Sequence, residues 1–463
     1  MIADETNEVL RVAADGAREY LDGLASAPVR GGAVDGFGGS LPEDGDGALA
    51  AVRELATQGA SAATRSPGPR FFHFVTGGVT PAALGADWLA SAFDQSAFAW
   101  VGSPLGSRLE VVALDWLKQL FGLPEAWGGI LTTGATTANF TGLAAARQWW
   151  GAQHGLDVAR DGLARPVPVL SSGYVHSTAL KALAMLGIGR GALRTFSRDE
   201  AGRLDAEALE DALRELGGEP SILIGNAGDV NTGDFDPLDV MADLAERYGA
   251  WLHVDGAFGL FARVSPRTAA LAEGVERADS VIADGHKWLN VPYDCGFAFV
   301  RDQALLAKAF SLDAAYLPPP DDPRPNFGFL GPESSRRARG LAVWATLRAY
   351  GRRGHRELVE RCVDLAQRVA SRVDHAPDLQ RLADVPLNIV CFRFRPDGRS
   401  EDELDELNRR LGEAILEDGR VYVGTTVYRG HVAFRPAIVN WRTTEPDADL
   451  LVDVVRELGA RLA

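Results

Sequence analysis

A lysine and an aspartate in this sequence each come shortly after an apolar run, and their side chains could act together. Asp255 follows the run at 249–254, and Lys287 comes after the run at 278–283. A lysine amine can form a Schiff base with an aldehyde, and a carboxylate can keep a pyridine nitrogen protonated so that the ring accepts electrons. The pair therefore predicts a site for pyridoxal phosphate, with Lys287 and Asp255 as catalytic residues.

The apolar runs suggest how these two residues meet. Such runs are typical of buried parallel strands. Open parallel sheets bind ligands beyond the carboxyl ends of their strands, where a residue after each run would lie. We therefore expect Asp255 and Lys287 to face one pocket. The alternative is that Lys287 is a solvated surface lysine and that Asp255 caps a loop. This interpretation is weaker because both motifs occur in order.

A third segment could bind phosphate. Residues 131–139 read Leu-Thr-Thr-Gly-Ala-Thr-Thr-Ala-Asn and open a predicted helix at 140–150. A phosphate needs backbone amides, small residues that allow close approach, and preferably a helix N-terminus. The segment offers all three, although by itself it could be only a capped helix.

Two of these motifs carry a resemblance to a known family. His-Val-Asp-Gly-Ala-Phe at 253–258 and Asp-Gly-His-Lys-Trp at 284–288 resemble motifs of the group II pyridoxal-phosphate-dependent amino-acid decarboxylases, among them aromatic-L-amino-acid decarboxylase. The resemblance extends from about residue 70 to the end of the chain. It implies a fold-type I α/β enzyme, a carboxy-lyase that converts an L-amino acid into an amine and carbon dioxide, with pyridoxal 5'-phosphate as cofactor.

The resemblance also implies roles for further residues. His176 would be a third catalytic residue that stacks on one face of the pyridine ring, and Ala257 would be small because it faces the other side. An isolated histidine after an apolar run is otherwise more often structural. The residues that would contact the cofactor phosphate are Gly134, Ala135, Thr136 and His286.

Asp229 departs from the family pattern. It stands where a hydroxyl commonly contacts cofactor or substrate. An ionised carboxylate there would repel a substrate carboxylate unless the site compensates for it. The alternative is that Asp229 points away and leaves Asn231 or Thr232 to make the contact.

A second departure lies in the segment 312–333, which is too rich in proline to be regular structure. The resemblance implies a loop that closes over the neighbouring subunit's site and carries a proton-donating tyrosine. Phe327 aligns at that position and cannot donate a proton, which leaves open an oxidative decarboxylation-deamination that yields an aldehyde. Tyr316 or a water could supply the proton instead, and Phe327 could simply pack the loop.

The substrate is less clear from the sequence. Aromatic residues cluster where the family lines its pocket and dimer interface, and they favour an aromatic or apolar substrate unless they are core residues. An acidic substrate would need a basic residue, for which Arg70 is the nearby candidate. For Arg435 we expect a structural ion pair. The aromatic residues are Phe71, Phe72, Phe74, Phe98 and Trp100.

Composition narrows the class of protein. The 463 residues include 47 basic and 63 acidic ones, which give a formal net charge of -16. This charge argues against nucleic acids and anionic membranes as partners. The acidic N-terminus does not resemble a targeting peptide, and no apolar run is long enough to span a bilayer. We expect a cytoplasmic small-molecule enzyme. The resemblance implies in addition that the protein is a homodimer. A hypothesis of a different class is that the chain is a cofactor-binding protein without turnover.

The three cysteines predict no metal site. Cys295, Cys362 and Cys391 are widely spaced and odd in number, so that buried free thiols are the favoured interpretation.

The order of predicted elements indicates three parts. Strand-like runs alternate with amphipathic helices from about residue 70 to 309, which is the pattern of a doubly wound, mostly parallel sheet. We expect an N-terminal helical arm at 1–69, a large cofactor-binding domain at 70–335, and a smaller α+β domain at 336–463. The elements predicted outside the large domain are helices at 7–24, 336–350, 357–373 and 403–417 and strands at 387–394 and 421–424.

Overall fold

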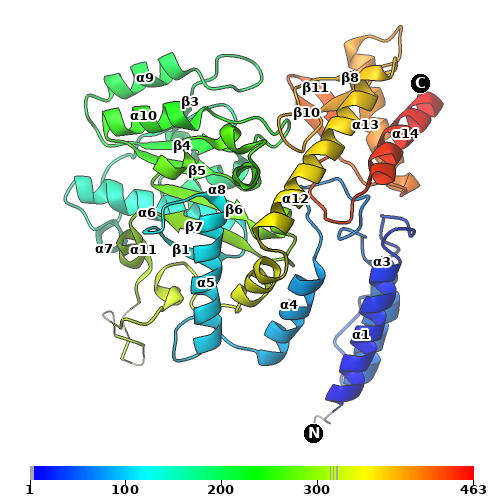
Figure 1. The fold of residues 1–463 in the computed structure, drawn as a ribbon, viewed down its shortest axis with the longest axis horizontal. Helices are drawn as coiled ribbons and strands as arrows, with labels where there is room; N and C mark the ends of the chain where they lie inside the picture. Colours follow the sequence, from blue (N-terminus) through cyan, green and yellow to red (C-terminus); the bar gives the residue numbers. More distant parts are fainter. Residues whose placement is uncertain (1–4, 313, 316, 320–321) are drawn as a thin grey trace.

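The largest element of the fold is a seven-stranded sheet, shown in Figure 1. The computed structural model describes residues 5–312, 314–315, 317–319 and 322–463. In spatial order the strands are β1 (Gly128–Thr132), β7 (Gly296–Val300), β6 (Ser280–Asp284), β5 (Trp251–Asp255), β4 (Ile222–Asn226), β2 (Val169–Ser171) and β3 (Leu193–Thr195). Strand β7 is antiparallel to both of its neighbours, and the other pairs are parallel. The predicted mostly parallel α/β sheet is confirmed.

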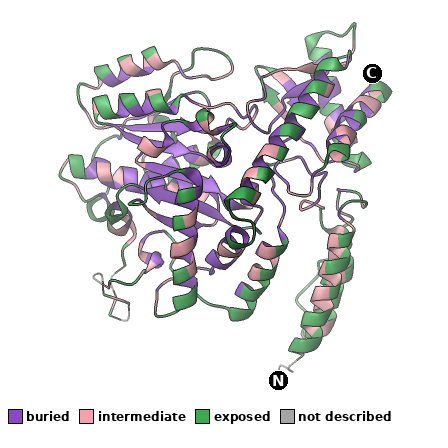
Figure 2. Cartoon of the chain, in the orientation of Figure 1, coloured by how far each residue is buried: buried purple, intermediate pink, exposed green. Residues whose placement is uncertain are grey.

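The central strands are buried on both faces, as Figure 2 shows. Their near-continuous apolar sequences suit that environment because helices cover the sheet. Helix α6 (Ala135–Gln153) packs against β5, β6 and β7, and α10 (Leu238–Tyr248) packs against β4 and β5. The other helices of this part are α4 (Pro81–Phe93), α5 (Pro104–Phe121), α7 (Val158–Asp161), α8 (Ser177–Met185), α9 (Ala206–Glu215) and α11 (Gln303–Phe310).

A long helix leads to the C-terminal part of the chain. Helix α12 (Gly340–His375) joins the two helices predicted at 336–350 and 357–373 into one element. At Gly351 the backbone dihedral angles are not helical, and the φ of 60° suits a residue without a Cβ. The two predicted helices are therefore two helical stretches that meet at a kink at Gly351.

The C-terminal part contains a four-stranded antiparallel sheet. Its order is β10 (Thr425–Tyr428), β11 (His431–Phe434), β9 (Phe392–Phe394) and β8 (Leu379–Arg381). Helices α13 (Glu401–Asp418) and α14 (Glu445–Leu462) complete it, and α13 confirms the helix predicted at 403–417.

One strand prediction in this part was wrong, and another was too long. The run at 421–424 forms no strand, because Tyr422 instead exchanges backbone hydrogen bonds with Arg70 and Phe72. The strand predicted at 387–394 is confined to its last three residues. Its earlier part pairs irregularly with the chain around Pro436, which has no N–H to donate to a ladder.

The N-terminal helices project as an arm at the right of Figure 1. The arm contains α1 (Thr6–Asp22), α2 (Ala48–Glu54), a π-helical turn at Leu55–Gly59 and α3 (Ala60–Ala62). None of these elements contains a buried residue. Among the described helices, none is both long and apolar enough to cross a membrane.

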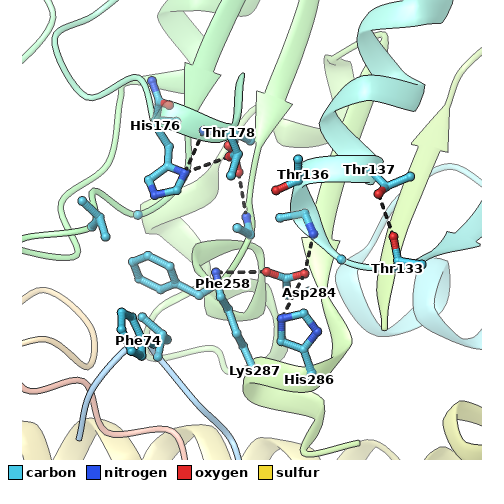
Figure 3. Close-up of a pocket in the computed structure, with 18 of the residues that line it drawn as sticks. Phe74, Thr133, Thr136, Thr137, His176, Thr178, Phe258, Asp284, His286 and Lys287 are labelled. Carbon is cyan, nitrogen blue, oxygen red and sulfur yellow. Dashed lines mark hydrogen bonds and ion pairs between the residues drawn. The ribbon is translucent and has the colours of Figure 1, made fainter. Parts of the chain in front are cut away.

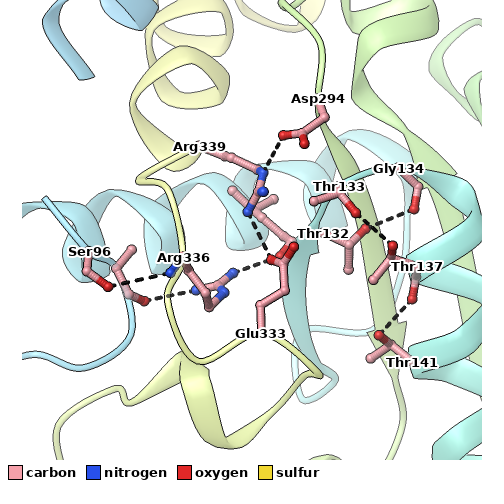
Figure 4. A network of polar contacts seen from close by, with 12 residues as sticks. Ser96, Thr132, Thr133, Gly134, Thr137, Thr141, Asp294, Glu333, Arg336 and Arg339 are labelled. Atoms are coloured by element: carbon pink, nitrogen blue, oxygen red, sulfur yellow. Dashed lines mark hydrogen bonds and ion pairs between the residues drawn. The ribbon is translucent and has the colours of Figure 1, made fainter. Parts of the chain in front are cut away.

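The proline-rich segment ends at a buried ion pair between Arg336 and Glu110. Figure 4 shows Arg336 within a wider network of polar contacts. The Arg336 guanidinium donates to Glu110 Oε1 at 2.8 Å and to the carbonyl oxygens of Ala97 and Leu131. Both side chains of the pair are 1% exposed. Arg336 thereby fixes the end of the proline-rich segment against β1. This edge strand leads into α6.

Candidate functional site

A cavity of about 420 Å³ opens beyond the carboxyl ends of β4, β5 and β6. Its wall includes Lys287, Asp255 and His176, so the structure brings the three predicted catalytic residues together. Ala257 and His286 also line it, together with the phosphate-binding candidates Gly134, Ala135 and Thr136. Figure 3 shows the cavity.

Asp255 is the last residue of β5 and is 5% exposed. Its Oδ2 accepts a hydrogen bond from Asn139 Nδ2 at 2.8 Å, and its Oδ1 accepts one from the backbone N–H of Ala257 at 3.1 Å. Two donors therefore hold the carboxylate in a fixed orientation, in which it can receive a protonated ring nitrogen.

Lys287 lies on a π-helical turn, Gly285–Leu289, that directly follows β6. Its Nζ is 3.0 Å from Oδ2 of Asp284 and 5.8 Å from the ring centroid of Phe258 (Figure 3). The other oxygen of Asp284 accepts the N–H of Ala135 at 2.6 Å. A buried carboxylate thus connects the amine to the first residue of α6.

The start of α6 has the features that a phosphate requires. Gly134 has a φ of 133°, and a Cβ at this position would lie 3.1 Å from His286 Cε1. A glycine is therefore needed both for the backbone conformation and for the close approach. The first residues of α6 line the cavity, and the N–H groups of a helix's first turn have no partner within the helix.

His286 is held beside this helix end. Its Nδ1 accepts the N–H of Cys295 at 3.3 Å, so the proton of the neutral ring is on Nε2, which lies 3.5 Å from Asp284. Burial lowers the pKa of His286. Tyr293 stacks on the ring at a centroid distance of 4.3 Å.

His176 is the N-cap residue of α8. Its Nδ1 accepts the N–H of Thr178 at 3.3 Å and lies 2.8 Å from the Thr178 hydroxyl. Nδ1 is therefore an acceptor, which leaves the proton on Nε2. Burial lowers the pKa of His176, so the ring is neutral at physiological pH.

Asp229 points away from the cavity. Its Oδ2 accepts hydrogen bonds from the N–H groups of Asn231 and Thr232 and from the Thr232 hydroxyl, at 2.9 to 3.0 Å. The carboxylate closes its own turn, whereas its neighbours Gly228 and Val230 line the cavity. This is the second of the two arrangements that the sequence left open for Asp229, but Asn231 and Thr232 do not line the cavity either.

The aromatic cluster predicted from the sequence is divided. Phe74 lines the cavity, whereas Phe71 stacks on Tyr422 and Phe98 packs edge-on against Phe329. The remaining members of the cluster, Phe72 and Trp100, do not line the cavity. Other aromatic residues that sequence reasoning missed, Tyr174, Phe258 and Tyr293, take part in the wall.

Arg70 was the expected basic residue of the pocket and Arg435 was expected to be structural, but the structure has Arg435 in the cavity wall and Arg70 outside it. Arg70 is buried outside the cavity, where it donates to the carbonyl oxygen of Ala27 at 2.7 Å. Arg435 lines the cavity, and its buried Nη1 has no hydrogen-bond partner among the described residues. The structural ion pair expected for Arg435 is therefore not found among the described residues. An unpaired guanidinium in a cavity is a receptor for an anion.

Phe327 does not line the cavity of its own chain. It begins a short 3-10 turn, Phe327–Phe329, is 4% exposed and lies 5.6 Å from the guanidinium of Arg336. Its role within this chain is packing at the base of the loop. Tyr316, the alternative proton donor, lies outside the described residues.

Asp284 and Asn139 are the polar residues that sequence reasoning missed. Both stood within the motifs that drew attention to Lys287 and to the phosphate segment, but neither was given a role. Their importance follows from contacts between segments that are distant in the sequence, Asp284 with α6 and Asn139 with β5. The cavity therefore offers an amine, an oriented carboxylate, a neutral histidine and a helix N-terminus, which are the groups that pyridoxal 5'-phosphate requires.

Metal chemistry has no site among the described residues, where no group of three or more histidine, cysteine, aspartate or glutamate side chains could hold an ion. The three cysteines are free and buried, as expected.

Comparisons with known proteins agree with this donor set. Residues 37–395 match the family described as "Pyridoxal-dependent decarboxylase conserved domain". Aromatic-L-amino-acid decarboxylase of Bacillus atrophaeus is 30% identical over 92% of this chain and 88% of its own length. L-2,4-diaminobutyrate decarboxylase of Rhizobium meliloti is 32% identical over 91% of this chain and 84% of its own. The structure of Oryza sativa TDC with PLP and tryptamine superposes with a TM-score of 0.91, at 27% identity, over 100% of this chain and 99% of the other.

Proposed function

The chain belongs to the family of pyridoxal-dependent decarboxylases, and on this premise we propose that Lys287, Asp255 and His176 are its catalytic residues. The family makes the protein an amino-acid decarboxylase with pyridoxal 5'-phosphate as cofactor. The observation that carries the residue assignment is that Lys287 and Asp255, at the ends of neighbouring strands, line one cavity with the N-terminus of α6.

Each residue of the proposed site has a distinct task. Pyridoxal 5'-phosphate supplies an electron sink for the electrons that remain at Cα when carbon dioxide leaves. Lys287 provides the amine that holds the aldehyde, and Asp284, 3.0 Å from Nζ, is placed to take the proton that this amine must lose. Asp255 holds the proton on the ring nitrogen. The phosphate would be bound by Gly134, Ala135, Thr136 and His286.

The two faces of the ring are assigned to small and flat groups. His176, fixed by Thr178, would stack on one face, and Ala257 would lie at the other. Together they hold the ring in one plane, so that the bond to the carboxylate can be aligned perpendicular to it.

We assign the substrate to the L-amino acids with an aromatic or apolar side chain. Phe74, Val75, Val230 and Phe258 contribute apolar wall to the cavity. A second amine, as in diaminobutyrate, would need a free carboxylate. Within the described part of the wall the two carboxylates are Asp255 and Asp284, which the proposal already assigns to the ring nitrogen and to the Lys287 amine. These four apolar side chains therefore support the aromatic or apolar class.

Arg435 is the receptor that we assign to the substrate α-carboxylate. Its buried Nη1 is unpartnered among the described residues, and burial lowers its pKa without removing its charge at physiological pH. Its bidentate geometry matches a carboxylate. This contact selects amino acids over amines without itself accelerating the loss of carbon dioxide.

The simple decarboxylation is favoured over the oxidative branch. The matched family and the two relatives named above are decarboxylases, which supports the simple reaction. Phe327 packs against Arg336 outside the cavity of its own chain, and its loop is expected to act at the neighbouring subunit's site, so this position is compatible with either reaction. The experiment is to incubate the cofactor-loaded protein with a panel of L-amino acids in air while carbon dioxide, amine, aldehyde and peroxide are measured together. Amine without peroxide supports the proposal, aldehyde with peroxide supports the oxidative branch, and no product from any substrate supports a non-catalytic binder.

We also propose a cytoplasmic homodimer built from an arm at 1–69, a cofactor-binding domain at 70–335 and a C-terminal domain at 336–463. The arm helices bury no residue within the chain. Trp88, Leu89 and Phe93 of α4 are 45%, 52% and 47% exposed. A second copy of the chain that covers these surfaces would remove this apolar area from water.

A further inference from the structure

A chain of buried hydrogen bonds leads away from Asp255 into the core. Asn139, on the second turn of α6, is 0% exposed and donates from Nδ2 to Asp255 Oδ2 at 2.8 Å. Its Oδ1 lies 2.9 Å from His253 Nε2. His253 Nδ1 in turn lies 2.8 Å from the hydroxyl of Ser280, which accepts the indole N–H of Trp251 at 3.0 Å.

The direction of every hydrogen bond in this chain follows from one fact. An ionised carboxylate only accepts, so the atom of Asn139 that faces Asp255 is the NH₂ group, and the carbonyl oxygen faces His253. His253 must then donate from Nε2, and its Nδ1 must accept from Ser280. Burial lowers the pKa of His253 to about 4, which agrees with a neutral ring that carries one proton.

The same amide also reaches His176. Asn139 Nδ2 donates to the Thr178 hydroxyl at 3.2 Å, and this hydroxyl lies 2.8 Å from Nδ1 of His176. Because Thr178 accepts from Asn139, its own proton is free to be donated to His176. The NH₂ group of Asn139 therefore orients both Asp255 and, through Thr178, His176. In the proposed function Asp255 holds the ring nitrogen and His176 stacks on the ring.

We propose that Asn139 is a positioning residue of this site, which through one fixed amide sets the orientation of Asp255 and, by way of Thr178, the tautomer of His176. The proposal rests on the assignment of Asp255 and His176 under the proposed function. The remaining links, His253, Ser280 and Trp251, keep the amide from turning over. Gly142 allows this arrangement, since a Cβ there would lie 2.8 Å from His253 Cε1.

Asn139→Asp tests the proposal with little change in shape. The introduced carboxyl can still accept from His253, but when ionised it cannot donate to Asp255. A charged hydrogen bond contributes about 1.5 to 3 kcal/mol, so we expect the Kd for pyridoxal 5'-phosphate to rise roughly tenfold to a hundredfold. Two adjacent carboxyl groups share a proton at lower pH, so the loss should shrink as the pH falls.

Asn408→Asp is the matched control. Asn408 is also 0% exposed and makes hydrogen bonds through both ends of its amide, but to Phe394 and Leu404, outside the cavity. It should lower the melting temperature while the Kd of the folded protein and its pH dependence stay as in the wild type. If Asn139→Asp does not fold, Ser280→Ala, which releases His253 Nδ1 without touching the cavity, should still raise the Kd.

Each variant is titrated with the cofactor while the visible absorbance of the lysine-bound form is followed over a range of pH. A Kd and pH dependence for Asn139→Asp, or for Ser280→Ala in its place, that equal those of Asn408→Asp would overturn the positioning role. The site assignment fails separately, if the wild type develops no such absorbance or if Lys287→Ala retains it.

Discussion

The carboxylate of Asp284 binds the amine of Lys287 at 3.0 Å with one oxygen and the N–H of Ala135 at 2.6 Å with the other. Both partners are groups that a bound cofactor needs, the amine for its aldehyde and the start of α6 for its phosphate. Asp284 is itself only 3% exposed. The protein without cofactor therefore satisfies its own binding groups internally, and loading must replace these contacts.

This competition predicts that Asp284→Asn strengthens the binding of inorganic phosphate to the cofactor-free protein. The change removes a negative charge beside the helix end, and a like charge in such a partly buried site is worth on the order of 1 kcal/mol or more. We expect the phosphate Kd to fall about fivefold to tenfold by isothermal titration calorimetry. Asp87→Asn, which removes a carboxylate paired with Arg337 outside the cavity, is the control. An unchanged or weaker phosphate affinity would contradict the competition.

Lys287→Ala should abolish both the visible absorbance of the loaded protein and carbon dioxide release. No other amine can replace it, because Lys287 is the one lysine in the described wall of the cavity. Lys181→Ala, on the partly exposed α8, is the control that should retain both properties. Decarboxylation by the Lys287 variant would show that the amine is supplied elsewhere.

Arg435→Gln should raise KM and leave kcat nearly unchanged. The guanidinium is assigned to the substrate carboxylate, so that its removal weakens ground-state binding, which we expect to raise KM about tenfold. The melting temperature should not fall, because the buried Nη1 has no partner to lose among the described residues. A large fall in kcat with an unchanged KM would instead place Arg435 in the chemical step. Steady-state kinetics with the substrate found in the panel decides between the two.

The strand ends could be predicted from the sequence because their cause is local. Asp255 and Lys287 follow apolar runs that are long enough only for buried strands, and parallel strands place their carboxyl ends at one edge. The turn at Asp229 is equally local, since an aspartate readily caps N–H groups two and three residues ahead, and this could have been decided from the sequence.

Other features depend on packing between distant segments. Tyr422 pairs with the chain at 70–72 and not with its own neighbours, which no local pattern indicates. Whether Arg435 has a partner likewise depends on which side chains from distant segments reach it, and a local sequence pattern does not show this. Asn139 gave no signal beyond its place in a helix-opening segment, because its partners lie more than a hundred residues away, apart from Thr178.

The exposed apolar face of α4 predicts that charge there will separate the proposed dimer. We expect the wild type to be a dimer by light scattering after size exclusion, and Trp88→Glu with Phe93→Glu to shift it toward the monomer, because burying two carboxylates in an apolar interface is unfavourable. Met185→Glu, at a residue of α8 that is 58% exposed, adds a comparable charge elsewhere and should leave the dimer intact. A monomeric wild type would contradict the assignment of this face.

His253 predicts that the cofactor-free protein loses stability in mild acid. Burial lowers the pKa of His253 to about 4 in the folded state, whereas the unfolded chain takes up this proton near pH 6.5. Between these values the unfolded state binds more protons, so the contribution is complete above pH 6.5 and decreases as the pH falls toward 4. At pH 5 the loss amounts to about 2 kcal/mol from this residue.

The measurement is the free energy of unfolding in urea at several pH values. His253→Gln should flatten the dependence in that window by this amount even if it lowers stability overall, whereas His375→Gln, at an exposed histidine, should leave the dependence unchanged. Equal pH dependences for the wild type and His253→Gln would mean that His253 takes up its proton equally in the folded and unfolded states, so that the fold does not keep the ring neutral in mild acid.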